Sequence, residues 1–434
     1  MKEVVLSDVI KTANTGLDAI RRAPIVAYKT DIRCLRIQDI SQKKDFNNWG
    51  YTKVSPQDFE KYKLLKNDII MARTCSTGIS FFTKENMQAV FNNGLLRIRA
   101  DEDKVYPLFL YYVFKSKKFE NYINGISSGT SVQLNMKIGD LIKYSFTLPN
   151  LDKQKNITNI LKNIDDKITL NTQTNQTLEQ IAQATFKHWF IDFTPVHAKA
   201  NALARGETIE QAELAAMACL SGKTVEKITA LKTEDPTAYH QLQQTAAAFP
   251  SEFVETEMGQ VPKGWEYKFL NEVCKIAYGK NLPTKQLLDQ GYPVFGGNGI
   301  IGYFDRYLYE QPQTLISCRG AASGKIMYSA PKSFITNNSL IIESNELLDY
   351  FYIYEYLKNK DITPYISGSA QPQITISSIE KIKILLPQDF ILERYSSLVS
   401  NLYNKIYLNN KNNELLAKTR DQLLPKLLNG EIEL

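Results

Sequence analysis

The sequence predicts an α+β protein in which a mixed α/β region followed by a long helix occurs twice. Three observations predict this class. The length of 434 residues is enough for several domains. Segments of the first half reappear in the second half, and each half contains one long stretch with the heptad spacing of a packed helix. We therefore expect a pseudo-two-fold internal repeat.

The repeat is visible in matching segments. Leu6–Ala13 resembles Leu270–Ala277, and Asp68–Arg73 resembles Thr314–Arg319, with a glycine five residues after each arginine. The offset between matching positions falls from 264 to 240 in the first part of each copy and then stays at 238 from Pro149 onward. Loops tolerate insertions, whereas a packed helix keeps its register. Each copy therefore consists of a variable α/β region and a constant helix.

The constant parts are residues 150–193 and 388–434. Apolar residues recur at steps of four and three from Ile157 to Ala182, and again from Tyr395 to Leu416. Some 36–40 helical residues make a rod of roughly 55–60 Å. Two such rods in one chain are expected to pack on each other as a coiled coil. Pro425 is expected to end or kink the second rod early, because proline cannot continue a helix normally.

Four asparagines occupy the same heptad positions in the two helices, namely Asn171, Asn175, Asn409 and Asn413. We interpret them as residues of the helix–helix seam, where a buried asparagine selects one register at some cost in stability. The alternative is that all four face solvent.

The variable parts, residues 1–149 and 265–387, have the pattern of mixed α/β domains. Short apolar runs such as 67–72 and 314–317 predict strands, and the aromatic-rich segments 106–115 and 347–358 predict amphipathic helices. We interpret these aromatic residues as core rather than as a base-stacking platform.

Residues 194–264 have no counterpart in the repeat, and their Ala-, Gln- and Glu-rich composition predicts short helices. This segment is interpreted as a connector that lets the second copy start from the far end of the first rod. Within it, residues 194–262 hold 5 basic and 9 acidic residues, which leaves 47 basic and 37 acidic residues elsewhere. The excess of positive charge outside the connector suggests a polyanionic partner.

Catalytic and metal-binding patterns are missing from the sequence. Five widely spaced cysteines and three histidines fit neither a disulfide framework nor a zinc site, and indicate a reducing cytoplasm. No run approaches 18 apolar residues, and the first residues do not resemble a secretory signal.

Gly297–Gly302 matches G-x-G-x-x-G, but an aromatic segment follows where a nucleotide site needs a helix, so a glycine-rich turn is expected. Glu102–Lys104 is interpreted as a solvated turn rather than a nuclease cluster.

Two further motifs are missing as well. The sequence has no G-x-x-x-x-G-K-[ST] phosphate loop and no Asn-Pro-Pro-aromatic motif of amino-methyltransferases. We therefore expect a protein that is not itself an enzyme.

Several segments resemble the specificity subunit of type I restriction–modification systems, and the likeness covers nearly the whole chain. The stretches that carry it are Leu151–Asn171, Leu178–Phe193, Glu257–Glu266 and Leu423–Glu431. Gly296–Tyr303 matches only in outline, because the recognition regions vary within the family.

The resemblance implies two target-recognition domains joined by two long antiparallel helices. It implies double-stranded DNA, two methyltransferase subunits and restriction or motor subunits as partners, with no membrane association. No cofactor is expected on this chain; S-adenosylmethionine, ATP and Mg²⁺ are expected on the partner subunits. The differing recognition regions imply an asymmetric, bipartite target.

The candidate DNA-binding residues lie in repeated polar loops and in segments unique to each copy. In the first region they are Lys43, Lys44, Arg73, Thr74, Ser76, Thr77, Gly78, Ser128, Thr130 and Gln133. In the second they are Lys285, Asn298, Arg319, Ser323, Lys325, Ser369, Gln371 and Gln373. Residues shared by both regions are also consistent with structural turns or phosphate contacts, since they do not differ between the two readers.

Two other functions are kept as alternatives. The first is a single-chain DNA methyltransferase or nuclease, and the second is a coiled-coil protein adaptor. The aromatic cluster Phe186–Phe193 is interpreted either as a methyltransferase docking surface or as core packing.

Overall fold

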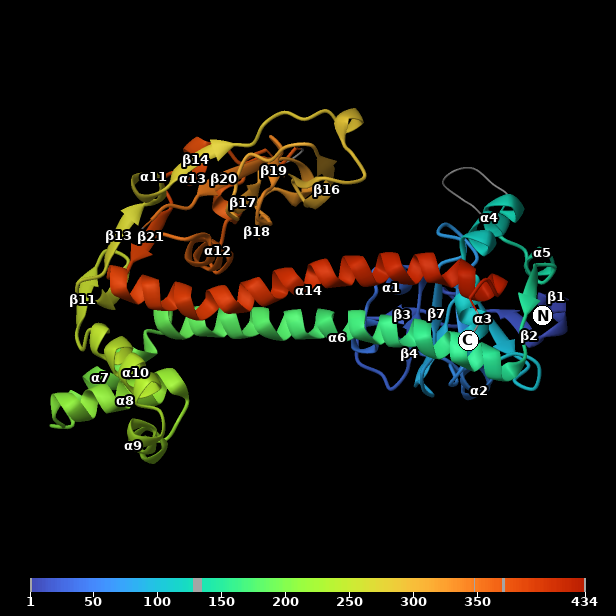
Figure 1. Ribbon diagram of the computed structural model, residues 1–434, viewed down its shortest axis with the longest axis horizontal. Coiled ribbons are helices and arrows are strands. Elements are labelled where there is room, and N and C mark those ends of the chain that lie inside the picture. Colours follow the sequence, from blue (N-terminus) through green and yellow to red (C-terminus); the bar gives the residue numbers. More distant parts are fainter. Residues whose placement is uncertain (1, 128–134, 347, 369–370, 433–434) are drawn as a thin grey trace. The chain divides into compact units, whose positions relative to one another are not determined.

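The computed structural model describes residues 2–127, 135–346, 348–368 and 371–432. The chain forms two compact units, Met1–Asn171 with Lys411–Leu434, and Thr172–Asn410. Two long helices, α6 (Leu151–Phe190) and α14 (Asp389–Asn429), each contribute one segment to both units (Figure 1).

The first unit contains an α/β module. Its elements are β1 Lys2–Val5, β2 Ile10–Thr15, β3 Ile25–Val26, β4 Arg33–Leu35, α1 Ile37–Ser41, β5 Gly50–Thr52, α2 Pro56–Tyr62, β6 Ile69–Ala72, β7 Ser80–Phe82, β8 Ala89–Phe91, β9 Leu95–Ala100, α3 Pro107–Phe114, α4 Lys117–Ile126, α5 Ile138–Leu141 and β10 Ser145–Leu148. One sheet has the order β2-β9-β6-β7 and another β3-β5-β4-β8, while β1 pairs with β10. All four residues of β6 are buried, as expected for an uninterrupted apolar run in a sheet interior.

The second unit contains a module of the same design. Its elements are β13 Glu266–Phe269, α11 Leu270–Val273, β14 Lys275–Tyr278, β15 Tyr292–Gly296, β16 Gly299–Phe304, β17 Thr314–Ser317, β18 Ile326–Tyr328, β19 Phe334–Ile335, β20 Ser339–Glu343, α12 Tyr350–Lys358, α13 Ile376–Ile379 and β21 Lys383–Leu386. The order β14-β20-β17-β18 matches β2-β9-β6-β7, and β13 pairs with β21 as β1 pairs with β10. The parallel pair β15 and β19 corresponds to β4 and β8. The internal repeat is therefore confirmed in the topology.

The aromatic helices of both modules belong to the core, as predicted. Proline at the first position of α3 and the Asp349 side chain at the start of α12, which accepts the Tyr352 N–H, define where these helices begin. Phe109 and Tyr112 of α3 are buried, and so are Phe351 and Tyr352 of α12.

The connector is a folded helical subdomain. It consists of α7 Thr194–Ala204, α8 Ile209–Ser221, α9 Val225–Glu234 and α10 Pro236–Ala248, followed by the hairpin β11 Phe253–Thr256 and β12 Gly259–Pro262. Ala216, Met217, Ile228 and Ala246 form its small core. The buried ammonium of Lys199 donates to the carbonyls of three residues at the end of α10, and burial lowers its pKa. The predicted short helices are confirmed.

The long helices are packed against each other in opposite directions. In the first unit the Asn171 amide donates to Asn413 Oδ1 at 2.9 Å. In the second unit Asn175 donates to Asn410 Oδ1 and accepts from Asn409 Nδ2, both at 2.8 Å. Residue numbers thus fall along α14 as they rise along α6, which is the antiparallel arrangement that the resemblance implied. The seam interpretation of the asparagines is confirmed.

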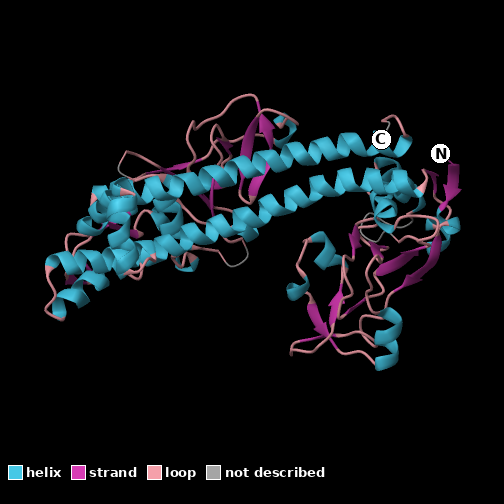
Figure 2. Cartoon of the chain, turned by 60° about the horizontal axis from the view of Figure 1, so that its bottom comes forward, coloured by secondary structure: helices cyan, strands magenta, loops and turns pink. Residues whose placement is uncertain are grey.

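Each module shares a hydrophobic core with its own segments of the long helices. In the first unit Leu161 of α6 and Leu427 of α14 join the core of the module. In the second unit Tyr395, Val399 and Tyr403 of α14 do so. Figure 2 shows the strands, in magenta, within the modules and the β11–β12 hairpin, whereas α6 and α14 run as continuous helices.

The structure corrects the expected end of α14 and decides between the two interpretations of the aromatic cluster at the end of α6. Helix α14 does not end at Pro425 but continues to Asn429, since Leu424, Leu427 and Leu428 are buried in the core of the first unit and hold the last turn in place. In the cluster Phe186–Phe193, the rings of Phe186, Trp189 and Phe190 are at most 5% exposed and pack into the second module. Core packing is therefore the correct interpretation for these three rings.

The asparagine seam leads to a test by mutation. We expect Asn175→Ala to lower the free energy of unfolding by about 1–3 kcal/mol, because it removes hydrogen-bond partners of two other seam amides. Urea unfolding followed by circular dichroism measures the change. Gln176→Ala, at an exposed neighbouring position, is the matched control. Equal midpoints for the two variants would contradict the role of the seam.

A buried carboxyl lies between α12 and α14. Glu355 is 0% exposed, and the hydroxyl of Tyr403 donates to its Oε1, while its Oε2 has no partner among the described residues. Burial raises the pKa of Glu355, and the Tyr403 hydrogen bond and Lys358 oppose the rise only in part. A carboxyl whose pKa is raised in the folded state destabilises the fold as pH rises through that pKa.

We therefore expect Glu355→Gln to match the wild type at low pH, where both side chains are uncharged, and to be more stable at higher pH. Thermal unfolding of both proteins at a series of pH values from about 4 to 8 tests this, since the series begins below the ordinary pKa of a glutamate, and the exposed Glu346→Gln is the control. A difference in melting temperature that does not grow with pH would show that the carboxyl is not the cause.

Candidate nucleic-acid interface

The first module holds Arg73 at the end of the buried strand β6. The Arg73 N–H donates to the Gly94 carbonyl at 3.0 Å, and its carbonyl accepts from the Met136 N–H at 2.8 Å. Its guanidinium donates to Thr15 Oγ1 at 3.5 Å and to Asn135 Oδ1 at 3.2 Å. Its Nε is buried without a partner among the described residues. Arg73 is thus half-buried, and its guanidinium is held by hydrogen bonds to Thr15 and Asn135.

The loop after Arg73 lies beside the segment that precedes α5. Thr74 forms an isolated bridge with Asn135, and Thr77 Oγ1 accepts from the Ser127 hydroxyl at 3.3 Å. Gly78 has φ +90°, a conformation that favours glycine, and its N–H donates to the Ala72 carbonyl. The structure therefore brings together the predicted residues Arg73, Thr74, Thr77 and Gly78; Ser76 is exposed in the same loop. The predicted residues Ser128, Thr130 and Gln133 lie outside the described residues.

The second module repeats this construction with an exposed arginine. Arg319 follows the buried strand β17 and forms a bridge with Gln373. The Pro372 carbonyl accepts from the Gly320 N–H at 3.0 Å and from the Ser323 hydroxyl at 2.7 Å. The Ser323 hydroxyl is thus engaged within the fold. A Cβ at Gly324 would lie 2.9 Å from Ile366, so glycine permits the close approach of the two loops.

The remaining candidates of the second module lie at two places. Gln371 and Gln373 are exposed on the loop opposite Arg319. The Lys325 ammonium donates to the Asn298 carbonyl at 3.3 Å and also to its side-chain oxygen. Lys285 is exposed in a short 3₁₀ turn, Thr284–Gln286, between β14 and β15. Ser369 lies outside the described residues. The glycine-rich segment around Asn298 forms the β15–β16 turn, with no helix after it, as expected.

The remaining candidates of the first module follow α1. Lys43 is exposed and has φ +49°, which ends the helix, and its N–H donates to the Ile40 carbonyl. Lys44 forms an ion pair of 3.6 Å with the buried carboxylate of Asp39. Of these two lysines, Lys43 has the more exposed side chain.

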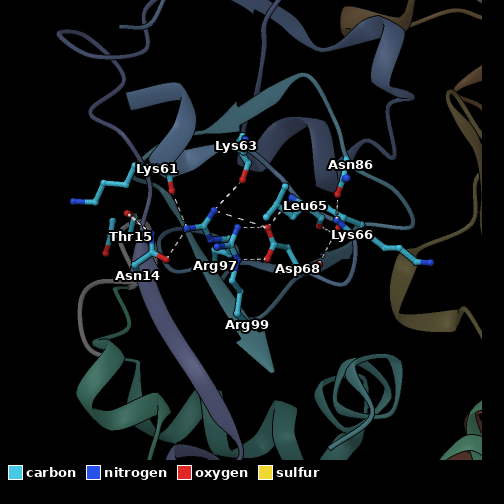
Figure 3. A network of polar contacts seen from close by, with 11 residues as sticks. Asn14, Thr15, Lys61, Lys63, Leu65, Lys66, Asp68, Asn86, Arg97 and Arg99 are labelled. Carbon is cyan, nitrogen blue, oxygen red and sulfur yellow. Dashed lines mark hydrogen bonds and ion pairs between the residues drawn. The ribbon is translucent and has the colours of Figure 1, made fainter. Parts of the chain in front are cut away.

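A buried network of charged residues lies in the sheet that carries β6 (Figure 3). Asp68, at the start of β6, accepts from Arg99 Nε at 2.6 Å and from the Leu65 N–H at 2.9 Å. Arg97, 4% exposed, donates to the Lys63 carbonyl at 3.0 Å and to Asn14 Oδ1 at 3.3 Å. Burial lowers the pKa of Arg97 to about 10, although the nearby Asp68 carboxylate favours the charged form.

This network supports the Arg73 loop through the backbone. Asn14, which binds Arg97, is followed on β2 by Thr15, which accepts from Arg73. The same strand therefore contacts the buried arginine and the loop arginine, so loss of the network is expected to affect the loop.

We expect Asp68→Asn to destabilise the protein by about 3–5 kcal/mol, because it leaves Arg97 and Arg99 without their buried counter-charge. Thermal or denaturant unfolding measures the loss. Asp103→Asn, in an exposed turn, is the matched control and is expected to change stability little. A loss no larger than that of the control would refute the role of the network.

Two features of the site were not predicted from the sequence. Asn135, which binds Arg73 and pairs with Thr74, follows the polar run that the repeat highlighted, but only its hydrogen bonds reveal its role. The Asp68–Arg97–Arg99 network had a signal in the two arginines of the otherwise apolar strand Leu95–Ala100.

Within the described ranges, no group of three or more His, Cys, Asp or Glu residues is placed to bind a metal ion. In the same part of the chain, no helix is long and apolar enough to cross a membrane. The duplicated module and the paired long helices define a protein built from two related modules, each sharing a core with the long helices and each carrying a corresponding polar loop.

Comparisons with known proteins extend this classification. The family described as type I restriction modification DNA specificity domain matches residues 6–180 and 262–418. The type I restriction enzyme HindI specificity subunit of Haemophilus influenzae is 35% identical over 378 residues, which cover 79% of this chain and 81% of that protein. The MjaIX specificity subunit of Methanocaldococcus jannaschii is 26% identical and covers 76% and 70%, respectively.

A solved structure shares the fold. The type I restriction–modification S subunit from M. genitalium superimposes with a TM-score of 0.54 at 17% identity, over 98% of this chain and 96% of that chain. Our chain belongs to the family of type I restriction–modification specificity subunits. It is a DNA target-recognition subunit and not itself an enzyme, which removes the single-chain methyltransferase or nuclease alternative.

Proposed function

We propose that the chain reads an asymmetric, bipartite double-stranded DNA target, with one half-site for each module. The observation that carries this proposal is that two modules with the same order in their main four-stranded sheet differ in the lengths and residues of their loops. The shared main sheet supports the same mode of docking, and unlike loops support unlike base sequences. The adaptor alternative has no comparable explanation for the two duplicated polar loops.

The gap between the half-sites would be fixed by the long helices. A bipartite target requires the two readers to keep their separation and phase, since one turn of B-DNA is about 34–36 Å long. Helices α6 and α14 have 40 and 41 residues, and each is continuous. A helical connection is stiffer than a flexible linker, which supports this part of the proposal.

The chain would act in the cytoplasm with partner subunits. We assign two methyltransferase subunits and the restriction or motor subunits as these partners, with S-adenosylmethionine, ATP and Mg²⁺ bound to them and no cofactor bound here. The names of the relatives, each a specificity subunit of a type I restriction enzyme, support this assignment.

The test is co-expression of the chain with its cognate methyltransferase subunit, followed by mapping of methylated positions in the host DNA. We expect two short, unlike sequences separated by a gap of constant length and unspecified sequence. Methylation should disappear when the chain is omitted. Binding of the purified complex to the mapped site should weaken steeply as salt rises, because phosphate contacts release counterions. A continuous or palindromic site would contradict two unlike readers.

A further inference from the structure

The two modules differ most sharply at one equivalent connection. In the first module β4 ends at Leu35 and β5 begins at Gly50, so fourteen residues join them and include α1. In the second module β15 ends at Gly296 and β16 begins at Gly299, so only two residues join them.

These connections are equivalent because their strands have the same partners. Strand β4 pairs antiparallel with β5 and parallel with β8. Strand β15 pairs antiparallel with β16 and parallel with β19. Lys43 and Asn298 therefore lie in corresponding connections of the two folds.

In the first module the start of the connection lies near Gly94, which binds the backbone of Arg73. A Cβ at Gly94 would lie 2.9 Å from the side chain of Ile37, the first residue of α1. The carbonyl of the same Gly94 accepts the N–H of Arg73 at 3.0 Å. One residue thus contacts both α1 and the arginine loop.

The second module has the same arrangement. A Cβ at Gly297 would lie 2.9 Å from Ser317 Oγ, at the end of β17, and 3.4 Å from the Asn338 carbonyl. That carbonyl accepts the N–H of Cys318, the residue before Arg319. Lys325, just after the arginine loop, donates to the backbone and side-chain oxygens of Asn298 in the β15–β16 turn.

The shared loops and the unlike connections differ in how their polar groups are used. In the shared loops the Arg73 guanidinium, the Thr77 hydroxyl and the Ser323 hydroxyl are bonded within the fold, whereas Arg319 is exposed. In the connections Lys43 is exposed, and the Asn298 amide is exposed with its oxygen bonded to Lys325. The shared loops are suited to contacts with DNA phosphates that position both modules in the same way, and the connections are suited to contacts with bases.

From this arrangement we propose, given the proposed function, that the β4–β5 connection and the β15–β16 turn are the base-reading elements of the two modules. Lys43 contacts guanine O6 and N7 in one half-site, and Asn298 contacts adenine in the other. The major groove admits a two-stranded ribbon such as β15–β16. Ile300 and Ile301, 49% and 44% exposed beside this turn, offer apolar contacts for thymine methyl groups. Arg73 and Arg319 contact phosphates.

The first arm of the test uses Lys43→Gly. Glycine suits the φ of +49° at this position, so the variant removes the side chain without straining the fold. Lys332→Gly is the matched control, because Lys332 is also an exposed lysine with positive φ, at +52°, and forms an ion pair with Glu310. Each full-length variant is co-expressed with the methyltransferase subunit, and methylated motifs are mapped.

The second arm uses Asn298→Asp. Aspartate keeps an acceptor for Lys325 but cannot donate to adenine N7, so the turn is retained while the adenine contact is lost. Asn271→Asp, on the exposed face of α11 in the same unit, adds the same charge and is the matched control.

We expect Lys43→Gly to relax one guanine position in one half-site by about tenfold or more, with the other half-site unchanged. Asn298→Asp should relax one adenine position in the opposite half-site by a similar factor. Both controls should leave the motif unchanged. Arg319→Ala should weaken binding of the complex to all sequences to the same extent and flatten its salt dependence.

The outcomes separate the two levels of the argument. A wild-type motif that is not bipartite would refute the proposed function itself. A bipartite wild-type motif that stays unchanged in both variants, or a uniform loss of affinity without a change of motif, would overturn the assignment of the base-reading elements alone. A change of motif in Arg319→Ala would also overturn it.

Discussion

Burial of the recognition modules against the long helices is the constraint on which the architecture depends. In the first unit the last turn of α14 inserts Leu424, Leu427 and Leu428 into the core of the module. In the second unit Tyr395 and Tyr403 of α14 lie in the main core. A helix that shares a core with a module cannot rotate independently of it, because interiors are close-packed. The helix segments are therefore part of each module rather than tethers.

The asparagine seam adds selectivity to this packing. Asn175 bonds Asn409 and Asn410 of α14, and a shift of either helix by one residue would separate the buried amides of Asn175 and Asn409. The cost of an unpaired buried amide makes the wrong register unfavourable, whereas an entirely apolar seam would tolerate sliding. The polar positions thus define the register, and the shared cores supply most of the stability.

Periodic features could be predicted from the sequence, and long-range hydrogen bonds could not. The heptad spacing predicted both long helices and the asparagine pairs, because helix contacts repeat at fixed steps. The alignment of the two copies predicted the arginine loops. The contact of Arg73 with Asn135, however, joins residues 62 positions apart, and no local pattern encodes it. Continuation of α14 past Pro425 likewise depends on a core formed by distant parts of the chain.

The separation between the shared strand scaffold and the proposed base-reading connections has a physical reason. Strands β6 and β17 are buried along their whole length, so a substitution there changes packing and lowers stability. Asn298 of the β15–β16 turn and Lys43 of the β4–β5 connection are exposed, although Trp49 of the latter connection lies in the core. Fourteen residues in one module replace two in the other, while β4 and β15 keep one antiparallel and one parallel partner each. Changes that are costly in the strands are thus tolerated at the exposed positions of the connections. A protein whose target must vary while its fold and partners remain is expected to place base recognition where sequence change leaves the core intact.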